Sequence, residues 1–237
     1  MSERSEIPMS TPENGFDFQK SMKNVQSYPF IHKYLPFDRY LIRPPASVIV
    51  KIVFSTSVTP NHLTLISFFF AMLAGLAFLG ARPVYFALGG ALALVSTIFD
   101  AADGMLARAK GMTSRYGAFL DLFLDRVADW AVLTGASFGY FRYTGSVRFL
   151  AFGLVTVGLY LLQLNLYYIN NVYTRAQKSG EGAEAKSLTV ILIFVFSIIG
   201  RPDGFLAGVF LLGLLGTLIK LVRFLRKGRD PEAAQFR

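Results

Sequence analysis

Four aspartates between long apolar runs constrain this chain more than any other feature of its sequence. Asp100, Asp103, Asp121 and Asp125 lie within 26 residues, and the segments on both sides are long and apolar enough to span a membrane. An acidic side chain near the bilayer centre costs about 2.5–3.5 kcal/mol, so four of them facing lipid would cost about 10–14 kcal/mol. We therefore expect the four carboxylates to face a wet cavity that holds ions, which makes this stretch a candidate functional site.

The overall composition indicates a membrane protein built from helices. Hydrophobic residues make up 53% of the 237 residues, which is more than an ordinary soluble domain carries. We predict an all-α integral membrane fold with six transmembrane helices, preceded by an N-terminal amphipathic helix at the interface. The predicted spans are 61–81, 84–108, 116–142, 147–176, 187–200 and 205–225. The fifth span is short, so it must tilt, extend into the preceding polar loop (177–186) or lie where the bilayer is thin.

Three regions follow from this interpretation. They are a polar N-terminus with the interfacial helix (1–60), a six-helix transmembrane unit (61–225) and a basic tail (226–237). Pro44 and Pro45 are expected to break the chain before the interfacial helix, which is predicted at 46–57 and is too short to span. The alternative for this segment is a first span that is slightly tucked into the membrane.

The net charge of +9 bears on partners and orientation. In a soluble protein it would suggest nucleic acid, but in a membrane protein it more often reflects basic ends that face anionic headgroups, so we predict membrane lipids and no nucleic acid as partners. Only four basic residues lie in the predicted outer turns: Arg82, Arg142, Arg148 and Arg201. This bias predicts a multi-pass protein whose two termini and aspartate cavity, near the 109–116 turn, are at the cytoplasmic side.

The spacing of the aspartates indicates what the cavity holds. Asp100 and Asp103 are three residues apart, Asp121 and Asp125 are four apart, and on helices each pair shares one face. Because no histidine or cysteine is nearby, two such pairs on facing helices form an all-oxygen site, which suits Mg²⁺ or Mn²⁺. Two such ions about 3.5–4 Å apart are a known device for displacement at phosphorus.

The same stretch carries a longer pattern, D-x2-D-G-x2-A-R-x8-G-x3-D-x3-D, whose other fixed positions are Gly104, Ala107, Arg108 and Gly117. In this pattern, and in Thr59-Pro60-Asn61 before the first predicted span, the chain resembles the CDP-alcohol phosphotransferase (CDP-alcohol phosphatidyltransferase) family. The resemblance covers residues 59–125. It implies a transferase of phospholipid synthesis that moves a substituted phosphoryl group from a CDP-linked donor to an alcohol hydroxyl and releases CMP.

The resemblance also implies roles for individual residues. By this likeness Asp100, Asp103, Asp121 and Asp125 hold two divalent cations, Mg²⁺ or Mn²⁺, and Asp125 is also the general base toward the acceptor hydroxyl. The residues implied to border the CDP group are Gly104, Ala107, Arg108, Gly117, Thr59, Pro60 and Asn61. Taken singly, the two glycines would be interpreted as helix-packing residues, Arg108 as an interfacial anchor and Asn61 as a helix cap.

Three further charged residues have alternatives that the sequence leaves open. Arg175 lies where family members that take phosphorylated acceptors often carry an arginine. Arg175 and Arg115, which is near the site mouth, are therefore candidates to bind an acceptor phosphate, and the alternative is that they reach lipid headgroups. Asp129 either extends the cavity or pairs with Arg126 or another buried donor, and we favour the pairing.

No residue decides between the substrates. We expect CDP-diacylglycerol as the donor, because a site near the interface leaves its acyl chains in lipid, and a polar alcohol such as inositol phosphate or glycerol phosphate as the acceptor. A soluble CDP-inositol donor with an inositol phosphate acceptor is the alternative within the family. A protein of another class, a cation transporter, is the remaining alternative, because acidic residues inside spans often mark an ion path. The aspartates disfavour it, since they cluster at one end of two helices and do not follow a route across the membrane. Family members are often homodimers, so the resemblance also includes a homodimer among the candidate partners.

Overall fold

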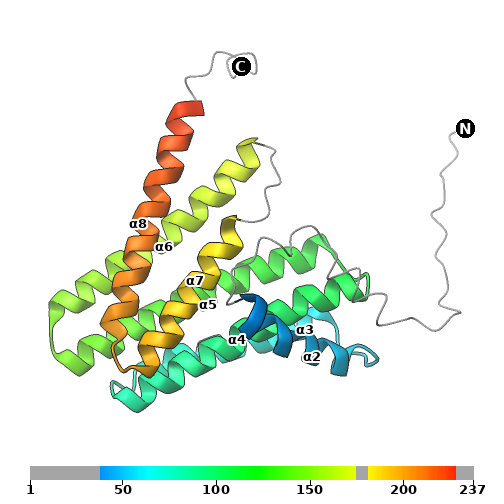
Figure 1. Cartoon of the computed structure of the whole chain (residues 1–237), viewed down its shortest axis with the longest axis horizontal. Helices are drawn as coiled ribbons and strands as arrows, with labels where there is room; N and C mark the ends of the chain where they lie inside the picture. Colours follow the sequence, from blue (N-terminus) through cyan, green and yellow to red (C-terminus); the bar gives the residue numbers. More distant parts are fainter. Residues whose placement is uncertain (1–37, 175–180, 228–237) are drawn as a thin grey trace, which may run out of the picture.

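The computed structural model describes residues 38–174 and 181–227, and within them all secondary structure is helical (Figure 1). The helices are η2 (Asp38–Ile42, a π-helical turn), α2 (Arg43–Val53), α3 (Pro60–Phe78), α4 (Pro83–Ala109), α5 (Arg115–Thr144), α6 (Val147–Thr174), α7 (Glu181–Ile198) and α8 (Pro202–Lys227). The all-α prediction is confirmed for these residues. Most of the predicted polar N-terminus and of the basic tail lies outside them.

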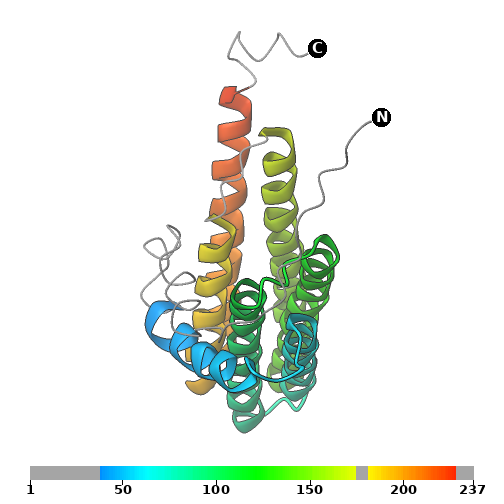
Figure 2. The same ribbon diagram turned by 90° about the vertical axis from the view of Figure 1, so that its right-hand side faces the viewer.

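Six long helices of the described chain form a closed ring. Its order is α3, α4, α7, α8, α6 and α5, and α5 packs back onto α3. The most extensive contacts are those of α3 with α4 and α5, while α2 lies outside the ring against α4 (Figures 1 and 2). Side chains of α3, α4, α5, α6 and α7 therefore meet in the interior of the ring.

Two predicted boundaries near the N-terminus are wrong. The helix predicted at 46–57 is α2, which begins at Arg43 and not at 46, because Pro44 and Pro45 stand in its first turn, where the missing proline N–H removes no helical hydrogen bond. Thr59, and not Asn61, caps α3, and its backbone N–H donates to Nδ1 of His62 at 3.2 Å. These contacts fix where α3 starts.

The predicted polar loop at 177–186 is wrong in its second half. α7 begins at Glu181, so the helix extends into the loop, which was one of the three ways for the short fifth span to gain length. The remaining loop residues, 175–180, lie outside the described residues, and Arg175 is among them.

Two groups of buried apolar side chains hold the ring together. The larger has members on all six helices of the ring, and in it the rings of Phe78 and Phe205 are 6.2 Å apart between centroids. The smaller joins α2, α3 and α4 through Val50, Leu63 and Leu106. Each such side chain contributes about 1.5–3 kcal/mol when it is fully buried. The second group holds α2 and the start of α3 beside the aspartate end of α4.

Two of the helices, α3 and α4, are long and apolar enough to cross a membrane, judged by length and composition alone. Large apolar side chains are also exposed on the described surface, and examples are Phe69, Leu76 and Phe123, each more than half exposed. An exposed apolar surface of this kind marks an interaction with lipid or with another protein.

Candidate active site

The carboxylates of the aspartate stretch converge where α4 ends and α5 begins. Asp100, Asp103 and Asp121 each offer one oxygen, and these three atoms lie within 4.8 Å of one another. They meet because the short turn 110–114 joins the end of α4 to the start of α5 while both helices pack against α3. Asp103 is buried, at 6% exposure, whereas the other two are half-buried. Asp125, one turn further along α5, belongs to a neighbouring cavity instead.

A first cavity, the turn cavity, opens between the start of α3 and the α4–α5 turn. It has a volume of about 160 Å³. Its lining residues are Pro60, Asn61, Thr64, Asp103, Gly104, Ala107, Arg108, Met112, Thr113, Ser114, Gly117, Ala118 and Asp121. Six of the seven residues implied to border CDP are among them. Thr59 is the exception, because it caps α3.

Local contacts hold the walls of the turn cavity in place. Ser114 caps α5, and its Oγ accepts the backbone N–H of Gly117 at 2.9 Å. Lys110, at the end of α4, donates from Nζ to the backbone oxygens of Thr56 and Val58, both at 2.8 Å. Since these two residues precede α3, the lysine ties the start of α3 to the aspartate end of α4.

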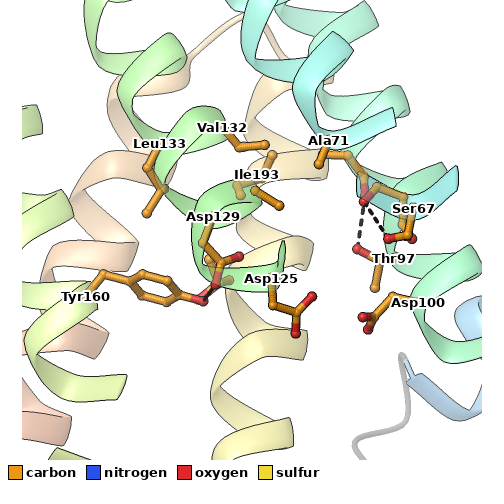
Figure 3. A pocket seen from close by; sticks show the side chains of 14 residues that line it. Ser67, Ala71, Thr97, Asp100, Asp125, Asp129, Val132, Leu133, Tyr160 and Ile193 are labelled. Atoms are coloured by element: carbon orange, nitrogen blue, oxygen red, sulfur yellow. Dashed lines mark hydrogen bonds between the residues drawn. The ribbon is translucent and has the colours of Figure 1, made fainter. Parts of the chain in front are cut away.

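A second cavity, the central cavity, lies inside the helix ring (Figure 3) and has a volume of about 40 Å³. Asp100 and Asp125 line it from α4 and α5, and their carboxylates point toward each other. Asp129 lines it too, and its Oδ2 accepts hydrogen bonds from Nη1 of Arg126 at 3.1 Å and from Oη of Tyr160 at 3.3 Å. Both interpretations of Asp129 therefore hold, because it borders the cavity and pairs with Arg126.

The aspartates thus stand between two cavities, the turn cavity on one side and the central cavity on the other. Asp103 and Asp121 line the first, and Asp100 and Asp125 line the second. A cation bound by these carboxylates would therefore have the turn cavity on one side and the central cavity on the other.

Sequence reasoning missed several polar residues here. Oγ1 of Thr64 donates to Oδ2 of Asp103 at 2.6 Å, and Tyr160 reaches Asp129 from α6. Ser67, Ser96 and Thr97 add hydroxyls to the central cavity. The available signal was the presence of hydroxyl residues inside apolar spans, but such residues also bond to their own helix, as Thr97 does to the carbonyl of Ala93.

Of the two predicted acceptor-phosphate residues, the structure describes only Arg115. Arg115 is the first residue of α5 and is exposed, and it lines neither cavity. Arg175 lies outside the described residues.

The donor set fits a hard divalent cation. The three converging ligands are carboxylate oxygens, which suit Mg²⁺ or Mn²⁺ better than zinc. The chain contains no cysteine and two histidines, one of which, His62, bonds to Thr59 at the start of α3. The chemistry of the site is therefore that of an oxygen-ligated cation beside a pocket with a basic guanidinium, Arg108.

Comparison with known proteins gives matches over most of the chain. A sequence model of the family described as CDP-alcohol phosphatidyltransferase matches residues 57–220. An archaetidylinositol phosphate synthase from Pyrococcus horikoshii is 30% identical over 187 residues, which cover 77% of this chain and 90% of that protein. A bifunctional IPC transferase and DIPP synthase from Aquifex aeolicus is 29% identical over 147 residues, which cover 60% of this chain but only 33% of that protein.

The fold has solved counterparts. Crystal structures of Mycobacterium tuberculosis phosphatidylinositol phosphate synthase superpose with a TM-score of 0.60 in the form with CDP-DAG bound and 0.62 in the complex with manganese and citrate. The matches cover 76% and 78% of this chain, and 92% and 90% of those chains, at 20% and 19% identity. At this identity the likeness shows a shared fold.

Proposed function

The chain belongs to the CDP-alcohol phosphatidyltransferase family, and on this premise we propose that it transfers a phosphatidyl group from CDP-diacylglycerol to a hydroxyl of inositol phosphate and releases CMP. The transferase class follows from the family. The lipid donor and the inositol phosphate acceptor are supported by the relatives, one named archaetidylinositol phosphate synthase and one a phosphatidylinositol phosphate synthase with CDP-DAG bound.

One observation carries the proposal more than any other. Three carboxylate oxygens converge within 4.8 Å at the border of a cavity lined by Gly104, Ala107, Arg108 and Gly117. A nucleoside diphosphate needs a cation site for its pyrophosphate, a cationic side chain and room beside a helix backbone, and this cavity offers all three.

We assign the turn cavity to the CDP part of the donor. Small side chains at Gly104, Ala107 and Gly117 let the nucleotide approach the helices closely, and Arg108 pairs with phosphate oxygens through its planar guanidinium. Pro60 and Asn61 form the opposite wall. Thr59 does not line the cavity, but as the N-cap of α3 it holds the helix start that carries Pro60 and Asn61.

Asp100, Asp103, Asp121 and Asp125 are the proposed cation ligands, as in the sequence-based prediction. Bound Mg²⁺ or Mn²⁺ would neutralise the pyrophosphate and polarise its phosphorus, and the relative crystallised with manganese supports this choice. Asp125 faces the central cavity, where it would accept the proton of the acceptor hydroxyl. The hydroxyl oxygen then bonds to the phosphatidyl phosphorus, and the bond from that phosphorus to the CMP oxygen breaks.

A CMP-release assay tests this function. Purified protein with Mn²⁺ and CDP-diacylglycerol is offered inositol phosphate, free inositol or glycerol phosphate, and CMP should appear with inositol phosphate. Asp125→Asn should lower the rate by about 10²–10⁴-fold, because a general base contributes that much, while the unfolding midpoint stays unchanged. Asp203→Asn, the same change at the far end of the ring, should turn over like the wild type.

The other outcomes of the assay are equally informative. CMP release with CDP-inositol but not with CDP-diacylglycerol would favour the alternative donor. No CMP release from any CDP-linked donor, together with Mn²⁺ flux in proteoliposomes, would overturn the proposal in favour of transport.

We further propose that residues 61–225 form a six-span membrane unit whose termini and aspartate site are cytoplasmic, with α2 lying at the interface. The exposed apolar side chains and the distribution of basic residues support this topology. The chain has no cysteine, so single cysteines can report it. In intact cells an impermeant thiol reagent should label Val147→Cys, at the exposed start of α6, and not Met112→Cys, in the α4–α5 turn. The reverse labelling pattern would invert the topology.

A further inference from the structure

Thr64 on α3 stands next to the only one of the four proposed ligands that is buried. Asp103 is 6% exposed and Thr64 is 7% exposed. A carboxylate taken out of water must be compensated by hydrogen bonds or by a cation. The hydroxyl of Thr64 supplies one such bond, from Oγ1 to Oδ2 of Asp103, and at 2.6 Å it has the length of a charge-assisted bond.

The hydroxyl has a competing acceptor, which its geometry disfavours. Oγ1 of Thr64 also lies 3.3 Å from the backbone oxygen of Pro60, one turn earlier in α3. A hydroxyl donates one proton, and the shorter contact to a charged oxygen is the stronger of the two. The side chain therefore faces across to α4 rather than back along its own helix.

Neighbouring contacts hold the two helices that carry Thr64 and Asp103. Lys110 ties the residues before α3 to the end of α4, and the Thr59–His62 pair caps the helix one turn before Thr64. The start of α3, which carries Thr64, is thus joined to the end of α4, which carries Asp103, by contacts that do not involve a cation.

From this arrangement we propose that Thr64 is a positioning residue, which orients the carboxylate of Asp103 for the divalent cation. The proposal rests on the proposed function only in taking Asp103 as a cation ligand. A partner that orients a metal ligand typically changes metal affinity by 10–100-fold when it is removed.

The test is Mn²⁺ binding to the purified protein without nucleotide or lipid substrate, by isothermal titration. Thr64→Val keeps the shape of the side chain and removes the hydroxyl, so the Kd for Mn²⁺ should rise about 10-fold or more. Thr64→Ser keeps the hydroxyl and should bind within about two-fold of the wild type, which is below the range expected for loss of such a partner. The matched control is Thr156→Val, because Thr156 is also buried but bonds to the carbonyl of Phe152 on its own helix.

Three results would overturn the inference. They are a wild-type Kd in Thr64→Val, an equal loss in Thr64→Ser, and an equal loss in Thr156→Val. Because binding is measured without turnover, failure of the proposed function is seen separately: a wild-type protein that binds Mn²⁺ but releases no CMP would refute the transferase and leave the role of Thr64 in place.

Discussion

Glycines serve opposite purposes at the two ends of α3, α4 and α5. At the far end, Gly135 and Gly139 on α5 press against the α3 backbone, so that an added Cβ would collide with the carbonyl oxygen of Gly75 or of Phe78. At the aspartate end, a Cβ on Gly104 would meet first the Arg108 guanidinium, at 3.3 Å from Nη1. The far-end glycines close two helices onto each other, and the aspartate-end glycines leave space.

The same contrast holds for Gly117, whose added Cβ would meet only side-chain atoms, Oγ of Ser114 at 3.0 Å and Oδ1 of Asn61 at 3.3 Å. The sequence could not separate the two uses, because a glycine on a membrane helix is compatible with helix packing wherever it stands. What separates them is the neighbouring element, which is a helix backbone at one end and a cavity at the other.

The largest effect is expected from a side chain at the far end. Gly135→Val adds a branched Cβ that would collide with the backbone carbonyl of Gly75, and backbone cannot move aside as a side-chain tip can. Overpacking costs about 1–3 kcal/mol and more where backbone must shift, so we expect loss of the monodisperse folded protein. Thermal unfolding in detergent measures this, and Mn²⁺ should not rescue it. A wild-type midpoint would refute the close packing.

An intermediate effect is expected from Gly104→Ala. The added methyl displaces the Arg108 guanidinium within the turn cavity, so the KM for the CDP-linked donor should rise about 10-fold, the equivalent of 1.4 kcal/mol. Stability should hold or increase, because alanine favours a helix over glycine by about 1 kcal/mol.

Gly158→Ala is the matched control for that change. Gly158 is exposed on α6 and an added Cβ would meet nothing within 4 Å, so the helix gains the same propensity without touching a cavity. An unchanged donor KM in Gly104→Ala, or an equal rise in Gly158→Ala, would remove the distinction between the two kinds of glycine.

The part of the site that could be predicted is the part set by local chain geometry. Helical periodicity predicts that Asp100 and Asp103 share one face of their helix, and a short turn brings Asp121 of the next helix close to them. The same local argument failed at Pro44 and Pro45, because proline is tolerated in a first helical turn.

The rest depends on contacts between residues far apart in sequence. Thr64 and Asp103 are separated by 39 residues, and Asp129 and Tyr160 by 31. Which helix lies beside which is decided by packing of the whole ring, so no local pattern could show that α6 would bring a tyrosine hydroxyl to the central cavity. The central cavity, which is lined by five helices, could not be predicted from the sequence for the same reason.

The smallest effect is expected from a carboxylate at the far end. Arg201 donates to Asp203 from Nε at 3.1 Å and from Nη2 at 3.0 Å, and these bonds hold the pKa of Asp203 below its usual range. A carboxyl with a lowered folded-state pKa stabilises the fold above its unfolded pKa of about 3.9 and loses that contribution as the pH falls through the folded value.

Between pH 5 and pH 8 the Arg201–Asp203 pair should therefore give a constant contribution, and one that is small because Arg201 is largely exposed. Asp203→Asn should lower the unfolding midpoint slightly at pH 7, lose that difference below about pH 4, and leave CMP release and Mn²⁺ binding unchanged. Unfolding midpoints across this pH range measure it. A loss of turnover as severe as that of Asp125→Asn would mean that carboxylates at both ends of the ring serve the reaction, and the contrast between the two ends would fail.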